Sequence, residues 1–290
     1  MKRFTFVIAV LVGASVVLLQ AGGQPIRARN GMVVSQSEIA SQVGVDALED
    51  GGTAVDAAVA TAFALAVTHP TAGNIGGGGF LVPRAASGDA VAYDFRESAP
   101  AAATPTMWFE NEEYSFERHH LSHLSVGVPG TVAGLHLAWE EHGTLPWSRL
   151  VEPAIALAED GFTVTHDFSA SLKQALQRIQ IYPASVAQFS KHGVPYEAGE
   201  TFRQPDLART LQRIADLGPA GFYEGETARL LAQEMAANGG LITEDDLKAY
   251  RAIKREPIRG TYRGYEIISM PPPSSGGIVL VEMLNMLEGY

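Results

Sequence analysis

The sequence predicts a mixed α/β fold in which helices predominate. Two apolar runs, at 80–83 and 90–95, flank a turn at Gly88–Asp89 as paired strands do, and 257–269 reads as further strand pieces. Between these regions, apolar residues recur at the three- and four-residue spacing of helices. The segments with this spacing are 131–142, 148–160, 167–180, 205–217 and 224–238. No internal repeat or long linker divides residues 24–290 into independent domains.

The first 23 residues have the layout of a secretory signal peptide. Lys2 and Arg3 precede an apolar run from Phe4 to Leu19, and small residues follow at 21–23. A bilayer-spanning helix needs about 20 apolar residues, so the run is slightly short for a permanent anchor. An uncleaved anchor and a buried core helix are the alternatives. We expect a periplasmic or secreted protein, a location in which a chain without cysteine needs no redox protection.

A helix is expected over about 37–49, after a strand at 33–34. Ser35 or Ser37 can cap its first turn, and Gly51–Gly52 can end it. Capping hydroxyls at one end and glycines at the other therefore delimit this helix.

A second helix should run over 54–67, with Thr53 as its N-cap. Pro70 ends it, because the residue before a proline is pushed out of helical geometry. The sequence AVDAAVATAFALAV is apolar nearly all round, so this helix should be buried on most sides.

Four consecutive glycines, Gly76–Gly79, allow backbone conformations and close approaches that other residues forbid. A phosphate cradle is disfavoured, because the Lys and Ser or Thr of a P-loop do not follow and no βαβ unit surrounds the run. The alternatives are a tight turn where a helix meets a sheet, or glycines that pack backbone closely beneath an active site.

The motif DFRE, from Asp94 to Glu97, lies where a predicted strand ends. Arg96 can form a surface ion pair with the flanking acids. It can also grip a substrate carboxylate through two parallel hydrogen bonds. The residues alone leave both roles open.

The remaining polar side chains do not form a complete catalytic set. His119, His120 and His123 cluster without the carboxylate of an HExxH motif, so a solvated loop is expected and no metal site. No GxSxG motif is present, and Ser274 and Ser275 follow three prolines in what is first a rigid turn.

The C-terminal region should contain a short helix begun by Thr243, then the strand pieces of 257–269, and finally a helix over 278–288. The chain stops at MLNMLEGY, in or just after an amphipathic helix and without a polar tail. We therefore expect the sequence to be truncated at this point.

Composition excludes several classes of protein. With 46% apolar and 18% charged residues, the chain is not disordered. Lys and Arg total 21 against 32 Asp and Glu, and a net charge of −11 disfavours nucleic acid as a partner. The absence of cysteine excludes disulfides, thiolate metal sites and a cysteine nucleophile.

Taken together, six segments in order resemble the large-subunit region of the γ-glutamyltransferase (glutathione hydrolase) family, and most closely its bacterial periplasmic members. They cover nearly everything after the signal peptide. The segments are GGTAVDAAVATAFALAVTHPTAGNIGGGGF at 51–80, DFRESAP at 94–100, SVGVPGTVAGL at 125–135, LPWSRLVEPAIALAEDGF at 145–162, NGGLITEDDLKAY at 238–250 and YRGYEIISMPPPSSGG at 262–277.

The resemblance implies a four-layer α/β/β/α sandwich of the N-terminal-nucleophile hydrolases, with residues 24–290 as a truncated large-subunit region. Such a precursor cleaves itself, and the new N-terminal threonine of the small subunit attacks the γ-glutamyl amide. The resemblance also implies that Arg96 binds the α-carboxylate of the γ-glutamyl group. The partners would be the small subunit, glutathione or another γ-glutamyl compound, and an amino-acid or dipeptide acceptor. No cofactor or metal is implied.

The sequence departs from the family by lacking the segment that contains this threonine. The nucleophile should therefore lie beyond residue 290, no catalytic residue is assigned here, and the chain alone is expected to be inactive. Two alternatives remain, a β-lactam side-chain acylase of the same fold and a periplasmic binding or scaffold protein without catalysis.

Overall fold

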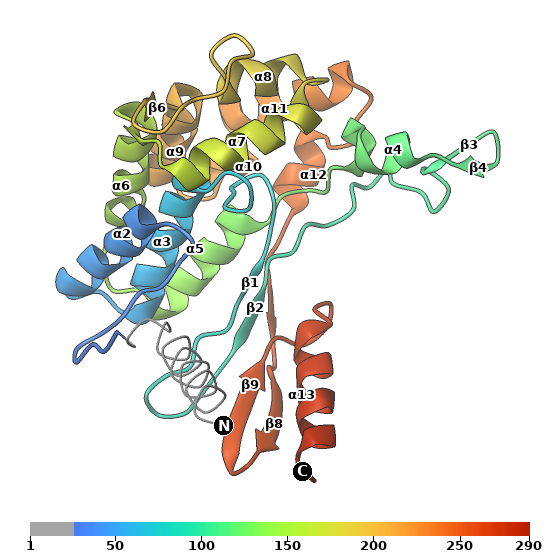
Figure 1. The fold of residues 1–290 in the computed structure, drawn as a ribbon. Coiled ribbons are helices and arrows are strands. Elements are labelled where there is room, and N and C mark those ends of the chain that lie inside the picture. The colour runs from blue at the N-terminus through green and yellow to red at the C-terminus, as the bar shows by residue number, and fades with distance from the viewer. Residues whose placement is uncertain (1–25) are drawn as a thin grey trace, which may run out of the picture. The chain divides into compact units, whose positions relative to one another are not determined.

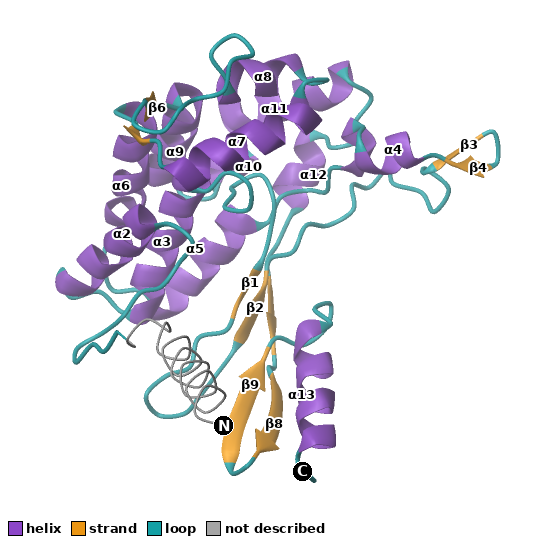
Figure 2. Ribbon diagram, viewed as in Figure 1, coloured by secondary structure: helices purple, strands orange, loops and turns teal. Residues whose placement is uncertain are grey.

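The computed structural model describes residues 26–290, so the signal peptide predicted for 1–23 lies outside the described residues. Residues 26–32 belong to a separate N-terminal unit and contain neither helix nor strand there. The described helices and strands lie in the second unit, Val33–Tyr290, and confirm the predicted mixed α/β class (Figures 1 and 2). From residue 26 onward, no helix has the length and apolar character needed to cross a membrane.

Helix α2 (Glu38–Glu49) confirms the first predicted helix. Ser37 is its N-cap, and the Ser37 hydroxyl accepts a hydrogen bond from the backbone N–H of Ala40. The strand predicted at 33–34 is wrong, because no strand of the described region pairs with these residues and Val34 is exposed. A two-residue apolar run without a hydrogen-bonding partner cannot form a ladder.

Helix α3 (Ala54–Thr68) is the buried helix that the sequence predicts. The Thr53 hydroxyl accepts from the N–H of Asp56, and the Asp56 carboxylate accepts from the N–H of Thr53, so the two residues form a capping box. The same carboxylate, which is fully buried, also accepts from the N–H groups of Thr144 and Leu145. Asp56 therefore fastens the start of α3 to the loop that follows α5.

The main core lies between α3 and three neighbouring helices. Helix α3 packs against α2, α5 (Thr131–His142) and α6 (Trp147–Glu159), and α6 also packs against α9 (Pro205–Leu217). The ring of Phe63 meets the indole of Trp147 edge to face, with centroids 5.5 Å apart. Figure 2 shows these helices gathered beside the strands that contain residues 80–81 and 92–94.

The sheet that leads to the candidate site has three antiparallel strands in the order β1 (Phe80–Leu81), β2 (Ala92–Asp94) and β7 (Ile253–Arg255). Tyr93 is the register partner of Leu81 on one side and of Lys254 on the other. The predicted pair of strands is confirmed in shortened form, whereas β7 was not predicted. Its sequence, IKR, is too short and too polar to show a strand period.

A second hairpin, β8 (Ile258–Tyr262) and β9 (Tyr265–Ser269), confirms the strand pieces of the C-terminal region. Helix α13 (Gly276–Leu287) follows and packs against both strands (Figure 1). Much of its apolar surface stays exposed, with Met283 at 46%, Met286 at 67% and Leu287 at 51%.

The five helices predicted between residues 131 and 238 are confirmed to within about one residue at each end, as α5, α6, α7 (His166–Ile179), α9 and α11 (Gly225–Ala237). The remaining elements are α8 (Pro183–Phe189), α10 (Ala220–Tyr223), α12 (Glu244–Ala249) and the pairs β3 (Phe109–Glu110) with β4 (Glu113–Tyr114) and β5 (Phe162–Thr163) with β6 (Thr201–Phe202). Helix α8 was not predicted. Pro183, a residue type that also favours turns, occupies its first helical turn, where proline is favoured.

The predicted solvated loop around the histidine cluster is wrong in its backbone. His119 and His120 end the short helix α4 (Phe116–His120), and His123 begins a 3₁₀ turn, His123–Ser125. Ser115 caps α4 through a hydrogen bond from the N–H of Arg118, a signal that was present in the sequence.

Candidate active site

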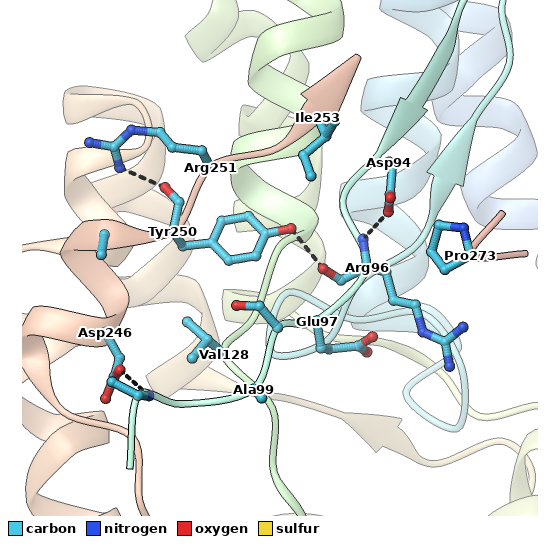
Figure 3. A pocket seen from close by; sticks show the side chains of 13 residues that line it. Asp94, Arg96, Glu97, Ala99, Val128, Asp246, Tyr250, Arg251, Ile253 and Pro273 are labelled. Atoms are coloured by element: carbon cyan, nitrogen blue, oxygen red, sulfur yellow. Dashed lines mark hydrogen bonds between the residues drawn. The ribbon is translucent and has the colours of Figure 1, made fainter. Parts of the chain in front are cut away.

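The DFRE segment leaves the end of β2 and lines a cavity of about 760 Å³. The cavity wall comes from this segment, from the loop before α5, from the end of α12 and the start of β7, and from the turn after β9. The lining residues are Asp94, Arg96, Glu97, Ser98, Ala99, Ala101, Val128, Asp246, Ala249, Tyr250, Arg251, Ile253 and Pro273 (Figure 3).

The main chain around Arg96 is held on both sides. The Arg96 N–H donates to Oδ1 of Asp94 over 3.1 Å, and the Arg96 carbonyl accepts from the hydroxyl of Tyr250 over 2.8 Å. Before it, Phe95 exchanges backbone hydrogen bonds with Gly79; after it, Ser98 exchanges them with Val128. The residue that carries the guanidinium is thus fixed in place.

The guanidinium itself is exposed and has no ion-pair partner within residues 26–290. The flanking acid Asp94 is occupied elsewhere: its Oδ2 accepts from Nε of Arg255 over 2.8 Å, and its side chain is only 5% exposed. The alternative in which Arg96 pairs with its neighbouring acids therefore does not hold. Figure 3 shows the Arg96 guanidinium extending away from Tyr250.

The glycine run lies directly against the DFRE segment. A Cβ at Gly78 would clash with the carbonyl oxygen of Phe95 and would lie 2.8 Å from the backbone nitrogen of Glu97. The N–H of Gly77 donates to Oδ1 of Asn74, which shapes the turn before it. Of the three interpretations of this run, the close packing of backbone beneath the site agrees with the structure.

Sequence reasoning missed a second close approach, at Gly130. A Cβ there would clash with both the carbonyl oxygen of Phe95 and the hydroxyl of Tyr250. Gly130 also donates to the carbonyl of Gly77 over 2.7 Å. Proline and glycine favour a turn at 129–130, but nothing in the local sequence indicates that this turn meets the DFRE segment.

Tyr250 and Asp246 were also missed as components of the site. Burial raises the pKa of the Tyr250 hydroxyl, and the nearby carboxylates of Asp94 and Glu97 raise it further. Burial disfavours the charged form of Asp246, but hydrogen bonds from the N–H of Ala101 and from Thr243 hold its pKa below the ordinary value. The Tyr250 hydroxyl therefore stays protonated and can donate a hydrogen bond. The Asp246 carboxylate holds the N–H of Ala101, which follows the DFRE segment in the chain.

The arrangement can bind an anion, but it holds no set of groups for acyl transfer. Among residues 26–290, neither histidine nor threonine lines the cavity, and the Tyr250 hydroxyl donates to the Arg96 carbonyl. Ser275 is the N-cap residue of α13 and Ser274 accepts from the N–H of Gly276, so the predicted turn is confirmed. Across residues 26–290, no three His, Asp or Glu side chains converge as metal ligands would.

Comparison with known proteins assigns the family. The family model for γ-glutamyltranspeptidase matches residues 40–290. The glutathione hydrolase proenzyme of Escherichia coli strain K12 is 51% identical over 268 residues, which are 92% of this chain and 46% of that protein. An acylase ACY 1 proenzyme of Pseudomonas sp. strain V22 is 42% identical over 274 residues, 92% of this chain and 49% of that protein.

Among solved structures, γ-glutamyltranspeptidase of Helicobacter pylori superposes with a TM-score of 0.90 at 45% identity, covering 92% of this chain and 77% of that chain. The chain spans about half the length of the curated relatives it matches. Both the family model and these identities extend across the DFRE segment and the cavity around it. The chain therefore belongs to the γ-glutamyltranspeptidase family.

Proposed function

We propose that this chain is the N-terminal part of a self-cleaving precursor that hydrolyses γ-glutamyl amides such as glutathione or transfers their γ-glutamyl group. The observation that carries the proposal is Arg96, an exposed residue that lines a large cavity, is held by main-chain hydrogen bonds on both sides and has no ion-pair partner among the described residues. A planar guanidinium binds a carboxylate through two parallel hydrogen bonds. In this proposal the carboxylate is the α-carboxylate of the γ-glutamyl group.

The chemical step requires a nucleophile that residues 26–290 do not place in the cavity. A threonine hydroxyl from the remaining part of the precursor would attack the γ-glutamyl carbonyl carbon and form an ester. Its proton would pass through the threonine's own α-amine to the leaving amine as the C–N bond breaks. Water or an amino-acid or dipeptide acceptor would then attack the ester and restore the hydroxyl. On this account the chain alone is inactive.

The rest of the precursor is proposed to pack on the C-terminal hairpin and α13, which would complete the four-layer α/β/β/α sandwich. Ile278, Leu280 and Met283 are each about two-fifths exposed, which is unusual for an apolar helix in a finished core. The names of the relatives, glutathione hydrolase proenzyme, and the half-length match support the same division into two parts.

We further propose that residues 1–23 are a signal peptide and that the protein acts in the periplasm or outside the cell. Their charged start, apolar middle and small-residue end support this assignment.

The acylase relative supports a second candidate, removal of an acyl side chain from a β-lactam. Arg96 favours the γ-glutamyl substrate, because a guanidinium with no partner needs an anionic group to offset its desolvation when the cavity is filled.

The experiment is a comparison of full-length precursors with and without Arg96. The wild type should release p-nitroaniline from γ-glutamyl-p-nitroanilide, and Arg96→Ala should raise KM at least 30-fold, since loss of a charged bidentate contact costs about 2–4 kcal/mol. Arg229→Ala is the matched control, because Arg229 pairs with Glu226 on the surface of α11, away from the cavity. An unchanged KM in Arg96→Ala would remove Arg96 from the binding site.

A further inference from the structure

Two buried tyrosines stack behind the DFRE segment. Tyr223 ends α10 and Tyr250 follows α12; their ring centroids are 5.8 Å apart and their planes differ by 4°. The two residues are 7% and 8% exposed, respectively. Stacking of this kind fixes both rings at low cost in side-chain entropy, because each has only two rotatable bonds.

Each ring ends in a hydroxyl that donates to the carbonyl of a different loop. Tyr250 donates to Arg96 over 2.8 Å, and Tyr223 donates to Pro129 over 2.9 Å while accepting from the N–H of Ala133. The loops themselves are joined by the backbone pair between Ser98 and Val128. The stacked pair therefore ties the DFRE segment to the turn before α5.

The hydrogen bond from the Tyr250 hydroxyl to the Arg96 carbonyl joins the backbone of Arg96 to a distant part of the chain. The other bond to that backbone, from the Arg96 N–H to Asp94, spans only two residues. The Tyr250 bond joins residues 154 positions apart in the chain, and both residues line the cavity. Without it, the peptide between Arg96 and Glu97 gains freedom to rotate, and the direction of the arginine side chain is less well defined.

We propose that Tyr250 is a positioning residue for carboxylate recognition: its hydroxyl holds the Arg96 carbonyl and so presents the guanidinium to the substrate. This inference rests on the proposed function. Gly130 supports it, because the absence of a side chain there is what lets the Tyr250 hydroxyl reach the segment. The raised pKa of Tyr250 keeps the hydroxyl protonated, so the bond persists across the pH range of an assay.

The test is Tyr250→Phe in the full-length precursor, which removes the hydroxyl and keeps the stacked ring. KM for γ-glutamyl-p-nitroanilide should rise about three- to tenfold, the net value of one neutral hydrogen bond, while kcat stays within twofold. Binding that is equal in ground and transition states appears in KM alone. Incorporation of 4-aminophenylalanine at position 250 restores an N–H donor and should recover most of the KM.

Tyr93→Phe is the matched control for loss of a buried phenol. Tyr93 lies on β2, and its hydroxyl bonds to Glu141 and His142 instead of the DFRE loop. This variant should melt at a lower temperature than the wild type, with the wild-type KM.

Should Tyr250→Phe not fold, Tyr223→Phe is the second variant. It loosens the other side of the stacked pair and should raise KM as well, but by a smaller factor than expected for Tyr250→Phe.

A double variant separates positioning from general loosening of the fold. If Tyr250 acts through Arg96, the double variant Arg96→Ala/Tyr250→Phe should have the same KM as Arg96→Ala alone. If the two residues act independently, the increases in KM of the two single variants should multiply. Multiplied effects, or a wild-type KM in Tyr250→Phe, would overturn the inference and leave the proposed function intact. A wild-type KM in Arg96→Ala, or no release of p-nitroaniline by the wild type, would overturn the proposed function itself.

Discussion

Helices α3 and α13 both consist largely of apolar residues, yet α3 is buried and α13 is not. In α3, eleven of 15 residues are buried, and α2, α5 and α6 pack around it. In α13 only Gly277 is buried, and β8 and β9 are its main neighbours. An apolar composition therefore predicts that a helix is stabilised by burial, and the surrounding elements determine whether it is buried within the described residues.

The N-terminus of α3 is also better satisfied by hydrogen bonds than the N-terminus of α13. The first turn of α3 is closed by a capping box, and the buried Asp56 carboxylate joins it to the loop after α5. The N-cap residue of α13, Ser275, has helical backbone angles and makes no side-chain capping bond. The contrast indicates that α3 belongs to a finished core, whereas the described residues leave α13 largely exposed.

The largest expected effect is a core truncation in α3. Phe63→Ala should lower the free energy of unfolding by about 3–5 kcal/mol, because Phe63 is fully buried against Trp147 and truncation of a buried ring leaves a cavity. Met283→Ala in α13 should change it by less than about 0.5 kcal/mol, because Met283 is 46% exposed. Urea unfolding of the 290-residue chain measures both. Equal losses at the two sites would show that α13 is buried in solution and would break the comparison.

A smaller effect is expected at the two helix starts. Thr53→Ala should cost about 1 kcal/mol, since it removes a capping hydroxyl from α3. Ser275→Ala should cost close to nothing, because that hydroxyl caps no backbone group of α13. Thermal melting of the two variants side by side gives the comparison, and a larger loss at Ser275 would contradict it.

The smallest effect concerns the pH dependence of the helical core. Burial against Trp139 and Trp147 lowers the pKa of His136, although the neighbouring Glu140 partly offsets this. As pH falls through about 6.5, the unfolded chain takes up the proton more readily than the folded one, so stability decreases. Urea unfolding between pH 7.5 and 5.5 should show this loss, and His136→Gln should reduce it. A stability that rises toward pH 5.5 would contradict the assignment.

The candidate site was predictable only in part. DFRE could be singled out because an arginine at the end of a strand is well placed to bind a substrate, and the resemblance gave Arg96 its proposed role. Tyr250, Asp246 and Gly130 could not be singled out, because the contacts that bring them to Arg96 join segments far apart in the chain. Local patterns carry no information about which distant loop a turn will meet.

The sequence by itself determined most of the helices, since the apolar period, capping hydroxyls and terminal glycines are local signals within a few residues. The short helices α4 and α8 are exceptions. It also determined the family, because motifs such as DFRESAP and PPPSSGG keep their order along the chain. The tertiary structure alone decided that Asp94 pairs with Arg255, that Arg96 has no ion-pair partner among residues 26–290, and that Tyr250 holds the Arg96 carbonyl. These choices depend on which strands and loops become neighbours, and that is settled by packing of the whole chain.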